Sequence, residues 1–363
     1  MAPKIEELDK NFAIGKKAEN DGRRLYDARD PRFSLRGVWY EEESGKYVRM
    51  PRARREAVSP GVAFLCTYTS GGRLLFRTDA RNLSLTVDYG EVTHLPHMPL
   101  TGTTGFDLYA YEEGYGWYYI HTVIPENETT RILETPLMRL PGGMRDYCLH
   151  FPPYNTVLDL RLSLPAEAVI EPPRRYKYDL PVVIYGSSIT EGACVSRPGN
   201  TYTNMLSRLV DCDHINLGFG GRAHGEEAMA DHIAALPQSA FIMDYDHNGS
   251  TEELEERHEA FFLRFRAAQP DTPVLLVTAP WFSHIGKGRE NGKNVAVIER
   301  TYRNALARGD RKVWFLNGAE FARIAGGDGT VDCGHPNDLG SFAMAQTIAP
   351  ILKKMLMGEE NHG

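Results

Sequence analysis

The sequence predicts an α/β protein with an N-terminal antiparallel β-sandwich and a C-terminal three-layer α/β/α domain built on a parallel sheet. Three observations predict it. Residues 33–170 form short strand-like runs separated by turns, residues 171–181 are rich in proline and charge, and residues 182–358 alternate between apolar strands and helices. Such alternation is typical of a parallel sheet covered on both faces. We therefore expect a sandwich domain at 1–170, a linker at 171–181 and a second domain at 182–358.

The strands expected in the first domain alternate apolar and polar residues and are rich in β-branched and aromatic side chains. They lie at 73–89, which is interrupted by a turn at Arg81–Asn82, and at 116–124 and 156–165. No helix is expected between residues 33 and 170. Many short strands with turn signals between them are typical of an antiparallel sandwich.

The second domain is expected to contain five strands and five helices in alternation. The strands are short apolar runs, as in a sheet buried on both faces, and the helices have apolar residues at helical spacing. The expected strands are 182–186, 214–218, 240–246, 273–280 and 312–318, and the expected helices are 200–210, 226–236, 251–269, 294–309 and 339–358.

Polar residues with reactive side chains or flexible backbones follow most of these strands. Ligands of such sheets bind beyond the carboxyl ends of the strands, so four segments should meet at one edge. They are Gly186-Ser187-Ser188-Ile189-Thr190, Asn216-Leu217-Gly218-Phe219-Gly220-Gly221, Asp246-His247-Asn248, and Asp332-Cys333-Gly334-His335 just before the last helix.

These four segments resemble, in order, the four blocks of the SGNH (GDSL-like) hydrolase family, which supply a serine, a glycine, an asparagine and a histidine. In the first domain, Gly105-Phe106-Asp107-Leu108-Tyr109 resembles the GxDLY motif of a sandwich domain that precedes some of these hydrolases. The resemblance implies a flavodoxin-like catalytic domain, a jelly-roll-like sandwich and an esterase activity.

The chemistry of the residues agrees with that resemblance. A serine hydroxyl needs a neighbouring base to become a good nucleophile, and His335 can be the base of Ser188. Asp332 can bind the other ring nitrogen and fix the tautomer. The backbone N–H groups of Ser188 and Gly221 and the side-chain amide of Asn248 are the candidate donors to the oxyanion of a tetrahedral intermediate.

Three positions depart from the family pattern. Ser187 stands where the family usually has an aspartate, Asp246 replaces a glycine, and Gly249 replaces the aspartate after the asparagine. Asp246 is expected to organise a loop. These departures leave the narrow subfamily open.

Three further residues are candidates for the pocket. Trp281 follows the fourth strand and could form the floor of an acyl or sugar pocket. Asp107 and Tyr109 could reach the catalytic edge from the sandwich, or could instead cap a turn and pack the interface between the domains.

Rival constellations explain less of the sequence. Gly218-x-Gly220-x-x-Ala223 with Asp244 matches a dinucleotide fingerprint, but it lies in the second βα unit and leaves Ser188 unexplained. His94 and His97, or Asp211 with His214, could be metal ligands, although neither pair has a matching second pair nearby in the sequence. No cofactor and no metal are therefore expected. The α/β-hydrolase pattern GxSxG is not met because Thr190 occupies the second glycine position.

Composition narrows the class of partner. The chain has 363 residues, of which 42% are hydrophobic, and a net charge of −7, which argues against nucleic acid as a partner. No run of 18 apolar residues predicts a membrane span, and the N-terminus lacks the apolar core of a signal peptide. We expect a cytoplasmic protein, although a trimmed chain would look the same. The sequence does not indicate an oligomeric state.

We therefore expect an esterase acting on a small acyl ester, most simply an acetyl ester of a carbohydrate or a similar polar alcohol. The carbohydrate expectation comes from analogy, because sandwich domains beside such hydrolases often resemble sugar-binding modules. Acyl transfer by the same acyl-enzyme and non-catalytic glycan binding are the alternatives. The sequence shows no long apolar lid or amphipathic interfacial segment, so a true lipase is not expected.

Overall fold

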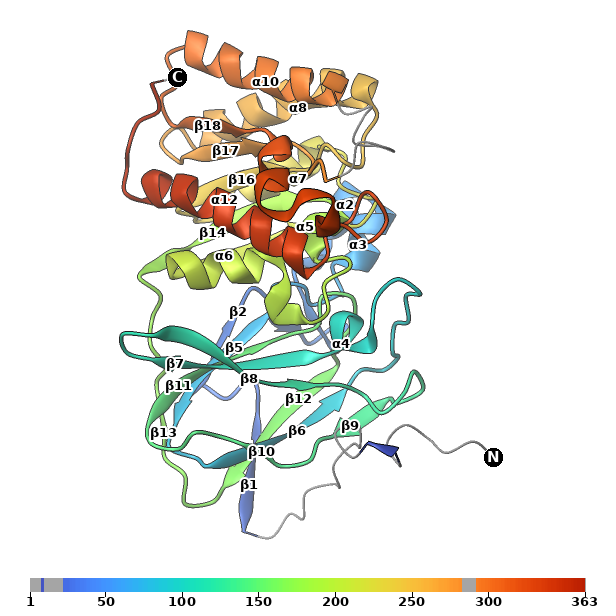
Figure 1. Cartoon of the computed structure of the whole chain (residues 1–363), viewed down its shortest axis with the longest axis vertical. Helices are drawn as coiled ribbons and strands as arrows, with labels where there is room; N and C mark the ends of the chain where they lie inside the picture. Colours follow the sequence, from blue (N-terminus) through green and yellow to red (C-terminus); the bar gives the residue numbers. More distant parts are fainter. Residues whose placement is uncertain (1–7, 10–21, 283–291, 363) are drawn as a thin grey trace.

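The computed structural model describes residues 8–9, 22–282 and 292–362. Two halves pack against each other, with strands of the N-terminal half at one end and a helix-covered sheet at the other (Figure 1). Both expected domain types are present. Within the described residues, no helix is long and apolar enough to cross a membrane.

The N-terminal half is a sandwich of two antiparallel sheets. The first has the order β1-β12-β6-β10, with β9 also paired to β6, and the second has the order β13-β5-β11-β7-β8, with β2 also paired to β5. Leu74, Phe76, Leu85 and Leu162 from the two sheets are fully or almost fully buried in one core between them. The strands are β1 (Arg23–Asp27), β2 (Ser34–Arg36), β5 (Arg73–Thr78), β6 (Asn82–Asp88), β7 (Phe106–Glu112), β8 (Gly116–Val123), β9 (Ile132–Glu134), β10 (Met138–Arg139), β11 (Arg145–His150), β12 (Asp159–Pro165) and β13 (Ile170–Glu171), beside a separate hairpin of β3 (Trp39–Glu41) and β4 (Lys46–Val48).

The C-terminal half has a five-stranded parallel sheet of order β15-β14-β16-β17-β18. This is the flavodoxin-like order, in which the first strand of the domain lies inside the sheet. The strands are β14 (Tyr178–Gly186), β15 (Cys212–Gly218), β16 (Ala240–Asp244), β17 (Val274–Val277) and β18 (Val313–Leu316).

Helices cover both faces of this sheet because its strands are apolar on both sides. Val182 and Ile184 of β14 pack toward α6 and α12, whereas Val183 and Tyr185 pack toward α7, α8 and α10. The helices are α5 (Ser188–Glu191), α6 (Tyr202–Val210), α7 (Glu227–Ala234), α8 (Thr251–Ala268), α10 (Gly292–Ala307), α11 (Ala322–Ala325) and α12 (Asp338–Leu356), with 3-10 helices η2 (Pro198–Asn200), η3 (Gly318–Phe321) and η4 (Gly326–Gly329).

The expectation that residues 33–170 contain no helix is wrong. Helices α2 (Arg52–Val58), α3 (Pro60–Leu65) and α4 (Leu100–Thr103) interrupt the strands. The start of α3 has a physical cause, since the Ser59 side chain accepts a hydrogen bond from the Val62 N–H and Pro60 occupies the first turn. These short helices lack a long apolar period, which is why the pattern of the sequence hides them.

Helices α2 and α3 lie beside the parallel sheet of the C-terminal half although they come from the N-terminal half (Figure 1). Met50, Val62 and Cys66 are fully buried in the same core as Val183 and Leu217. The second core is therefore completed by a segment more than a hundred residues upstream.

The segment between the halves is shorter than the expected linker. Strand β13 ends at Glu171, and β14 begins at Tyr178, four residues before the strand predicted at 182. Proline at positions 172 and 173 separates them, in keeping with a break in the pairing.

Candidate active site

Ser188 lies at the carboxyl end of β14, where the strand turns into α5. The Ser187 side chain accepts a hydrogen bond from the Ile189 N–H and so caps this helical turn. Gly186 is required just before it, because a Cβ at this position would collide with the Thr190 hydroxyl and the Asp244 carbonyl. The turn therefore presents Ser188 at the edge of the sheet.

Asp332 and His335 lie on the loop between η4 and α12. The Ser188 Oγ is 2.8 Å from His335 Nε2, and His335 Nδ1 is 2.7 Å from Asp332 Oδ2. The second carboxylate oxygen, Oδ1, accepts hydrogen bonds from the His335 N–H at 2.7 Å and the Gly334 N–H at 3.0 Å. The three side chains thus form one continuous hydrogen-bonded relay.

The Asp332 carboxylate is held in its charged form. Burial by itself would raise its pKa, but the hydrogen bonds from His335 and Gly334 outweigh burial and lower the pKa to about 2. The ionised carboxylate can therefore accept a hydrogen bond from the Nδ1–H of His335 at neutral pH. This leaves Nε2 free to take a proton from Ser188.

The candidate oxyanion donors surround the same serine. Gly221 has a φ of +65°, a conformation that favours glycine. Its N–H donates to no other described residue, whereas the Gly220 N–H donates to Glu191 Oε2 at 2.7 Å. Asn248 Nδ2 donates to the Phe219 carbonyl at 3.1 Å, which ties the asparagine to the glycine turn.

Ser188 opens into a cavity of about 580 Å³. Residues from both halves of the chain line it, because the loop before α4 reaches across to the edge of the sheet. The lining residues are Leu95, His97, Met98, Tyr154, Ser188, Ala193, Gly220, Gly221, His247, Asn248, Asp332, Cys333, Gly334 and His335. The structure thus brings together five of the eight predicted site residues: Ser188, Gly221, Asn248, Asp332 and His335.

The other three predicted residues lie outside this cavity. Asp107 is fully buried between the halves, where its Oδ2 accepts hydrogen bonds from Arg197 Nη1 at 2.7 Å and the Gly199 N–H at 2.8 Å. The Tyr109 hydroxyl accepts from the same Arg197 nitrogen at 2.7 Å. The GxDLY residues therefore bind the sandwich to the second domain, and Trp281 is absent from the cavity lining.

The sequence analysis gave no role to two histidines beside the site, although His247 belongs to the predicted segment Asp246-His247-Asn248. His97 and His247 flank His335, with ring centroids 6.1 Å and 6.4 Å from it. His97 was considered only as a metal ligand, and nothing in the sequence connects its loop to the strand end at Ser188, 91 residues later. Glu191 could have been found, since it follows Ser188 by three residues and so lies on the same helical turn.

The rival sites do not assemble. Asp244 is buried and accepts hydrogen bonds from the Thr190 and Tyr202 hydroxyls, which is not the environment of a ribose ligand. His94 lies 3.2 Å from Glu128 on the surface, and His214 packs against Arg73 in the interior. No group of three metal-binding side chains occurs among residues 8–9, 22–282 and 292–362.

Comparison with known proteins identifies the family of both halves. Residues 179–353 match the GDSL-like lipase/acylhydrolase family, and residues 24–170 match the GxDLY family, the N-terminus of esterases of the SGNH-hydrolase type. The chain belongs to the GDSL-like (SGNH) hydrolases. It is a serine ester hydrolase with a GxDLY-type sandwich at its N-terminal side.

Solved structures resemble this hydrolase over nearly its whole length. A protein described as a GDSL-like lipase from Bacteroides ovatus has 26% identity and a TM-score of 0.82, covering 92% of this chain and 98% of its own. The salicylyl-acyltransferase SsfX3 from a tetracycline biosynthetic pathway has 20% identity and a TM-score of 0.71, covering 91% and 96%. A family two carbohydrate esterase from Cellvibrio japonicus has 12% identity and a TM-score of 0.60, covering 93% and 98%.

The acyltransferase and the carbohydrate esterase are similar to this chain in fold alone, at 20% and 12% identity. No curated protein matches the sequence.

Proposed function

We propose that the hydrolase cleaves small acyl esters through an acyl-enzyme on Ser188. His335 Nε2 takes the hydroxyl proton while Ser188 Oγ bonds to the acyl carbon, and the same proton passes to the departing alcohol oxygen. Water, deprotonated by His335, then releases the acid and restores Ser188. The hydrogen-bonded relay from Ser188 through His335 to Asp332 is the observation that carries this proposal.

The oxyanion of each tetrahedral intermediate would be bound by the N–H groups of Ser188 and Gly221 and by the Asn248 amide. Donors fixed before the reaction stabilise the developing charge without reorganisation. The helical turn that begins at Ser188 leaves its first N–H groups without helical partners, which favours a negative charge there.

The surroundings of Ser188 favour a compact acyl group. Tyr154 and Ala193 contact the turn directly, because the Tyr154 hydroxyl donates to the Ser188 carbonyl at 3.2 Å and the Ala193 N–H donates to it at 2.9 Å. Together with Met98 they form a small apolar cluster. An acetyl or similarly short acyl chain suits such a surface, and a polar alcohol, such as a carbohydrate, suits the open side of the cavity.

Hydrolysis is favoured over acyl transfer by the exposure of the base. The His335 side chain is 26% exposed and that of Asp332 is 42% exposed, so water can reach the acyl-enzyme. An acyltransferase would be expected to exclude water from the intermediate.

A panel of esters tests the proposal. Wild type and Ser188→Ala would be offered p-nitrophenyl acetate, butyrate and octanoate, and acetylated oligosaccharides. We expect the acetyl esters to be hydrolysed fastest by the wild type and none by the variant above background. Equal hydrolysis by both proteins would refute the role of Ser188, and transfer to an added alcohol in preference to water would make the enzyme an acyltransferase.

A further inference from the structure

Arg49, which follows β4 in the N-terminal half, has a fully buried guanidinium that contacts both halves. Its Nε donates to the Tyr68 carbonyl at 2.8 Å, and Nη2 donates to the Leu65 carbonyl at 2.7 Å. Nη1 donates to the Gly218 carbonyl at 2.7 Å, at the end of β15. The Arg49 guanidinium is thus held on one side by carbonyl groups of the N-terminal half and on the other by a carbonyl group of the catalytic domain.

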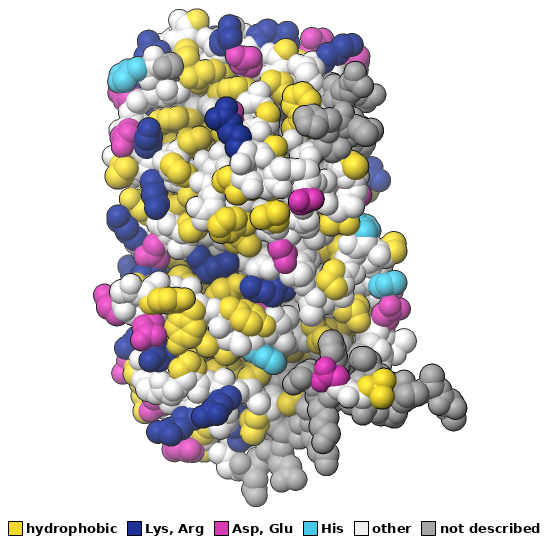
Figure 2. Space-filling model, in the orientation of Figure 1, with side chains coloured by type: hydrophobic (Ala, Val, Ile, Leu, Met, Phe, Trp, Pro, Cys, Tyr) yellow, Lys and Arg dark blue, Asp and Glu magenta, His cyan; other side chains and the backbone are white. Residues whose placement is uncertain are grey.

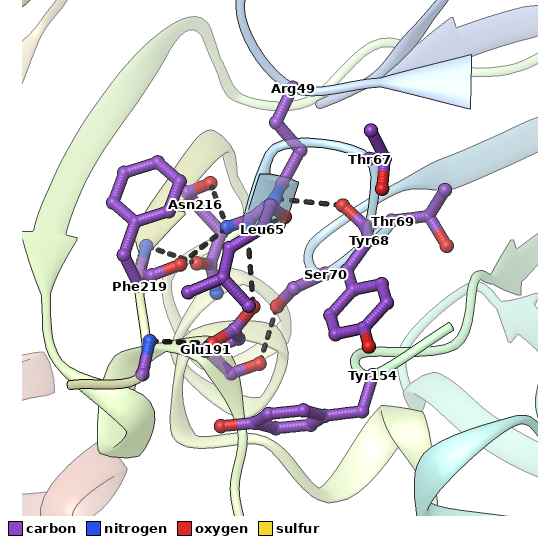
Figure 3. Close-up of polar contacts among 12 residues, drawn as sticks. Arg49, Leu65, Thr67, Tyr68, Thr69, Ser70, Tyr154, Glu191, Asn216 and Phe219 are labelled. Carbon is purple, nitrogen blue, oxygen red and sulfur yellow. Dashed lines mark hydrogen bonds and ion pairs between the residues drawn. The ribbon is translucent and has the colours of Figure 1, made fainter. Parts of the chain in front are cut away.

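The one charged partner of this guanidinium in Figure 3 is Glu191, on the helical turn of Ser188. Arg49 Nη2 lies 3.1 Å from Glu191 Oε1, and both side chains have no exposed surface. The Ser70 hydroxyl also donates to the Glu191 carbonyl at 2.5 Å. A buried carboxylate without its cation would be strongly disfavoured, so each member of this pair keeps the other in place.

The second oxygen of the same carboxylate holds the glycine turn. Glu191 Oε2 accepts the Gly220 N–H at 2.7 Å, one residue before Gly221. The backbone of Gly220 runs close to the serine, since a Cβ on it would lie 3.4 Å from the Ser188 Cβ. Arg49 also lies over the Phe219 ring, 4.7 Å from its centroid.

We infer that Arg49 is a positioning residue that acts through Glu191 to hold the Gly220–Gly221 turn at a fixed distance from Ser188. A residue of the N-terminal half thereby helps to fix the oxyanion site of the C-terminal half. The inference rests on the proposed function of Ser188. It explains why the segment from β4 to β5 is built into the hydrolase core.

Displacement of an oxyanion donor affects the transition state more than the bound substrate. For Arg49→Met we therefore expect kcat per active site on p-nitrophenyl acetate to fall by about 100-fold, the effect typical of a misplacement near 1 Å, with KM little changed. Affinity for methylboronic acid, which forms a tetrahedral adduct on a serine, should fall in parallel. Arg49→Lys, which keeps the charge but not the fork, should give an intermediate loss.

Arg73→Met is the matched control. Arg73 is equally buried, comes from the same half, and bonds to β15 at Asp213 and the His214 carbonyl, but it does not contact Glu191. Its loss should lower stability and leave kcat per active site near that of the wild type. Active sites in each protein would be counted by titration with a fluorophosphonate, so misfolded protein does not enter the rate.

Two results would overturn the inference while leaving Ser188 as the nucleophile. The first is a kcat per active site of Arg49→Met within twofold of the wild type. The second is an equal loss in Arg73→Met, which would mean that any damage to the interface has this effect. A wild type that the fluorophosphonate does not label would instead refute the proposed function, and the inference with it.

Discussion

At the scale of single residues, the Asp332 carboxylate decides which nitrogen of His335 carries a proton. Its two oxygens accept from the ring Nδ1, the His335 N–H and the Gly334 N–H, so the imidazole is oriented from both its backbone and its side chain. A neutral amide at this position could present an N–H to Nδ1 and favour the wrong tautomer.

We therefore expect Asp332→Asn to lower kcat by about 10⁴-fold, as loss of the orienting carboxylate does in serine hydrolases. The measurement is kcat on p-nitrophenyl acetate at pH 7 to 8. Asp328→Asn, an exposed carboxylate on the same loop region, is the control and should keep full activity. An Asp332→Asn enzyme within tenfold of the wild type would contradict the proposed relay.

Asn248 offers a second prediction at this scale. Replacing it with alanine removes a side-chain donor, which typically lowers kcat by about 10²- to 10³-fold with little effect on KM. Asn248→Asp keeps the shape but substitutes a negative charge for the donor, so it should be at least as inactive. Steady-state kinetics of both variants would check this, and an active Asn248→Asp enzyme would remove Asn248 from the oxyanion site.

At the scale of secondary structure, helices α2 and α3 belong to the N-terminal half in sequence and to the hydrolase core in space. Val62 of α3 is fully buried there, packed with residues of the parallel sheet. Val62→Ala should destabilise the protein by about 2 kcal/mol, from lost burial and the cavity left behind.

Urea unfolding would measure this change, with Leu25→Ala as the matched control. Leu25 lies on β1 and is 53% exposed, so its truncation should change the free energy of unfolding by about 0.5 kcal/mol or less. A Val62→Ala protein as stable as the control would mean that α3 does not contribute to the core.

The regular elements of the catalytic half could be predicted because their signal is local. Strands β14 to β18 and helices α6, α7, α8, α10 and α12 follow apolar runs and helical spacing, whereas the short α11 was not predicted. Ser188, Asp332 and His335 follow from motifs at strand and loop ends. Arg49, His97 and helix α3 could not be predicted, since their roles depend on contacts with residues far away in the sequence. The predicted pocket residues Asp107 and Tyr109 carry a recognisable motif, but it specifies an interface and not the cavity.

At the scale of the whole molecule, the two halves share buried contacts, so they should unfold together. Arg36, Arg49 and Arg73 of the first half all bond to β15 or to residues beside it. Positive and negative side chains alternate over the face shown in Figure 2, and those drawn in colour form no broad patch of one sign there.

Buried charge in this molecule also links its stability to pH. Burial raises the pKa of Asp246 to about 7, although the Ala279 N–H bonds to its Oδ2 and opposes the rise. The pKa of the neighbouring Asp244 is also raised to about 7, first by burial and in part by the charge of Asp246. A carboxyl group with a raised folded-state pKa favours folding below about pH 4, and this contribution is lost as pH rises through about 7.

Asp246→Asn should therefore gain stability relative to the wild type as pH rises from 5 to 8, because the amide never becomes charged. Melting temperatures of both proteins at the two pH values measure the difference. Because the variant is compared with the wild type at the same pH, the titration of other buried groups, such as the histidines, affects both proteins alike. The same difference at pH 5 and pH 8 would show that Asp246 does not titrate in this range.

The central claim is that Ser188 forms the covalent intermediate. Reaction with a fluorophosphonate, followed by proteolysis and mass spectrometry, tests it most directly. We predict one adduct per chain, on Ser188, formed far more slowly in His335→Ala and absent in Ser188→Ala. A wild-type protein that remains unlabelled, or that carries the adduct on another residue, would contradict the account.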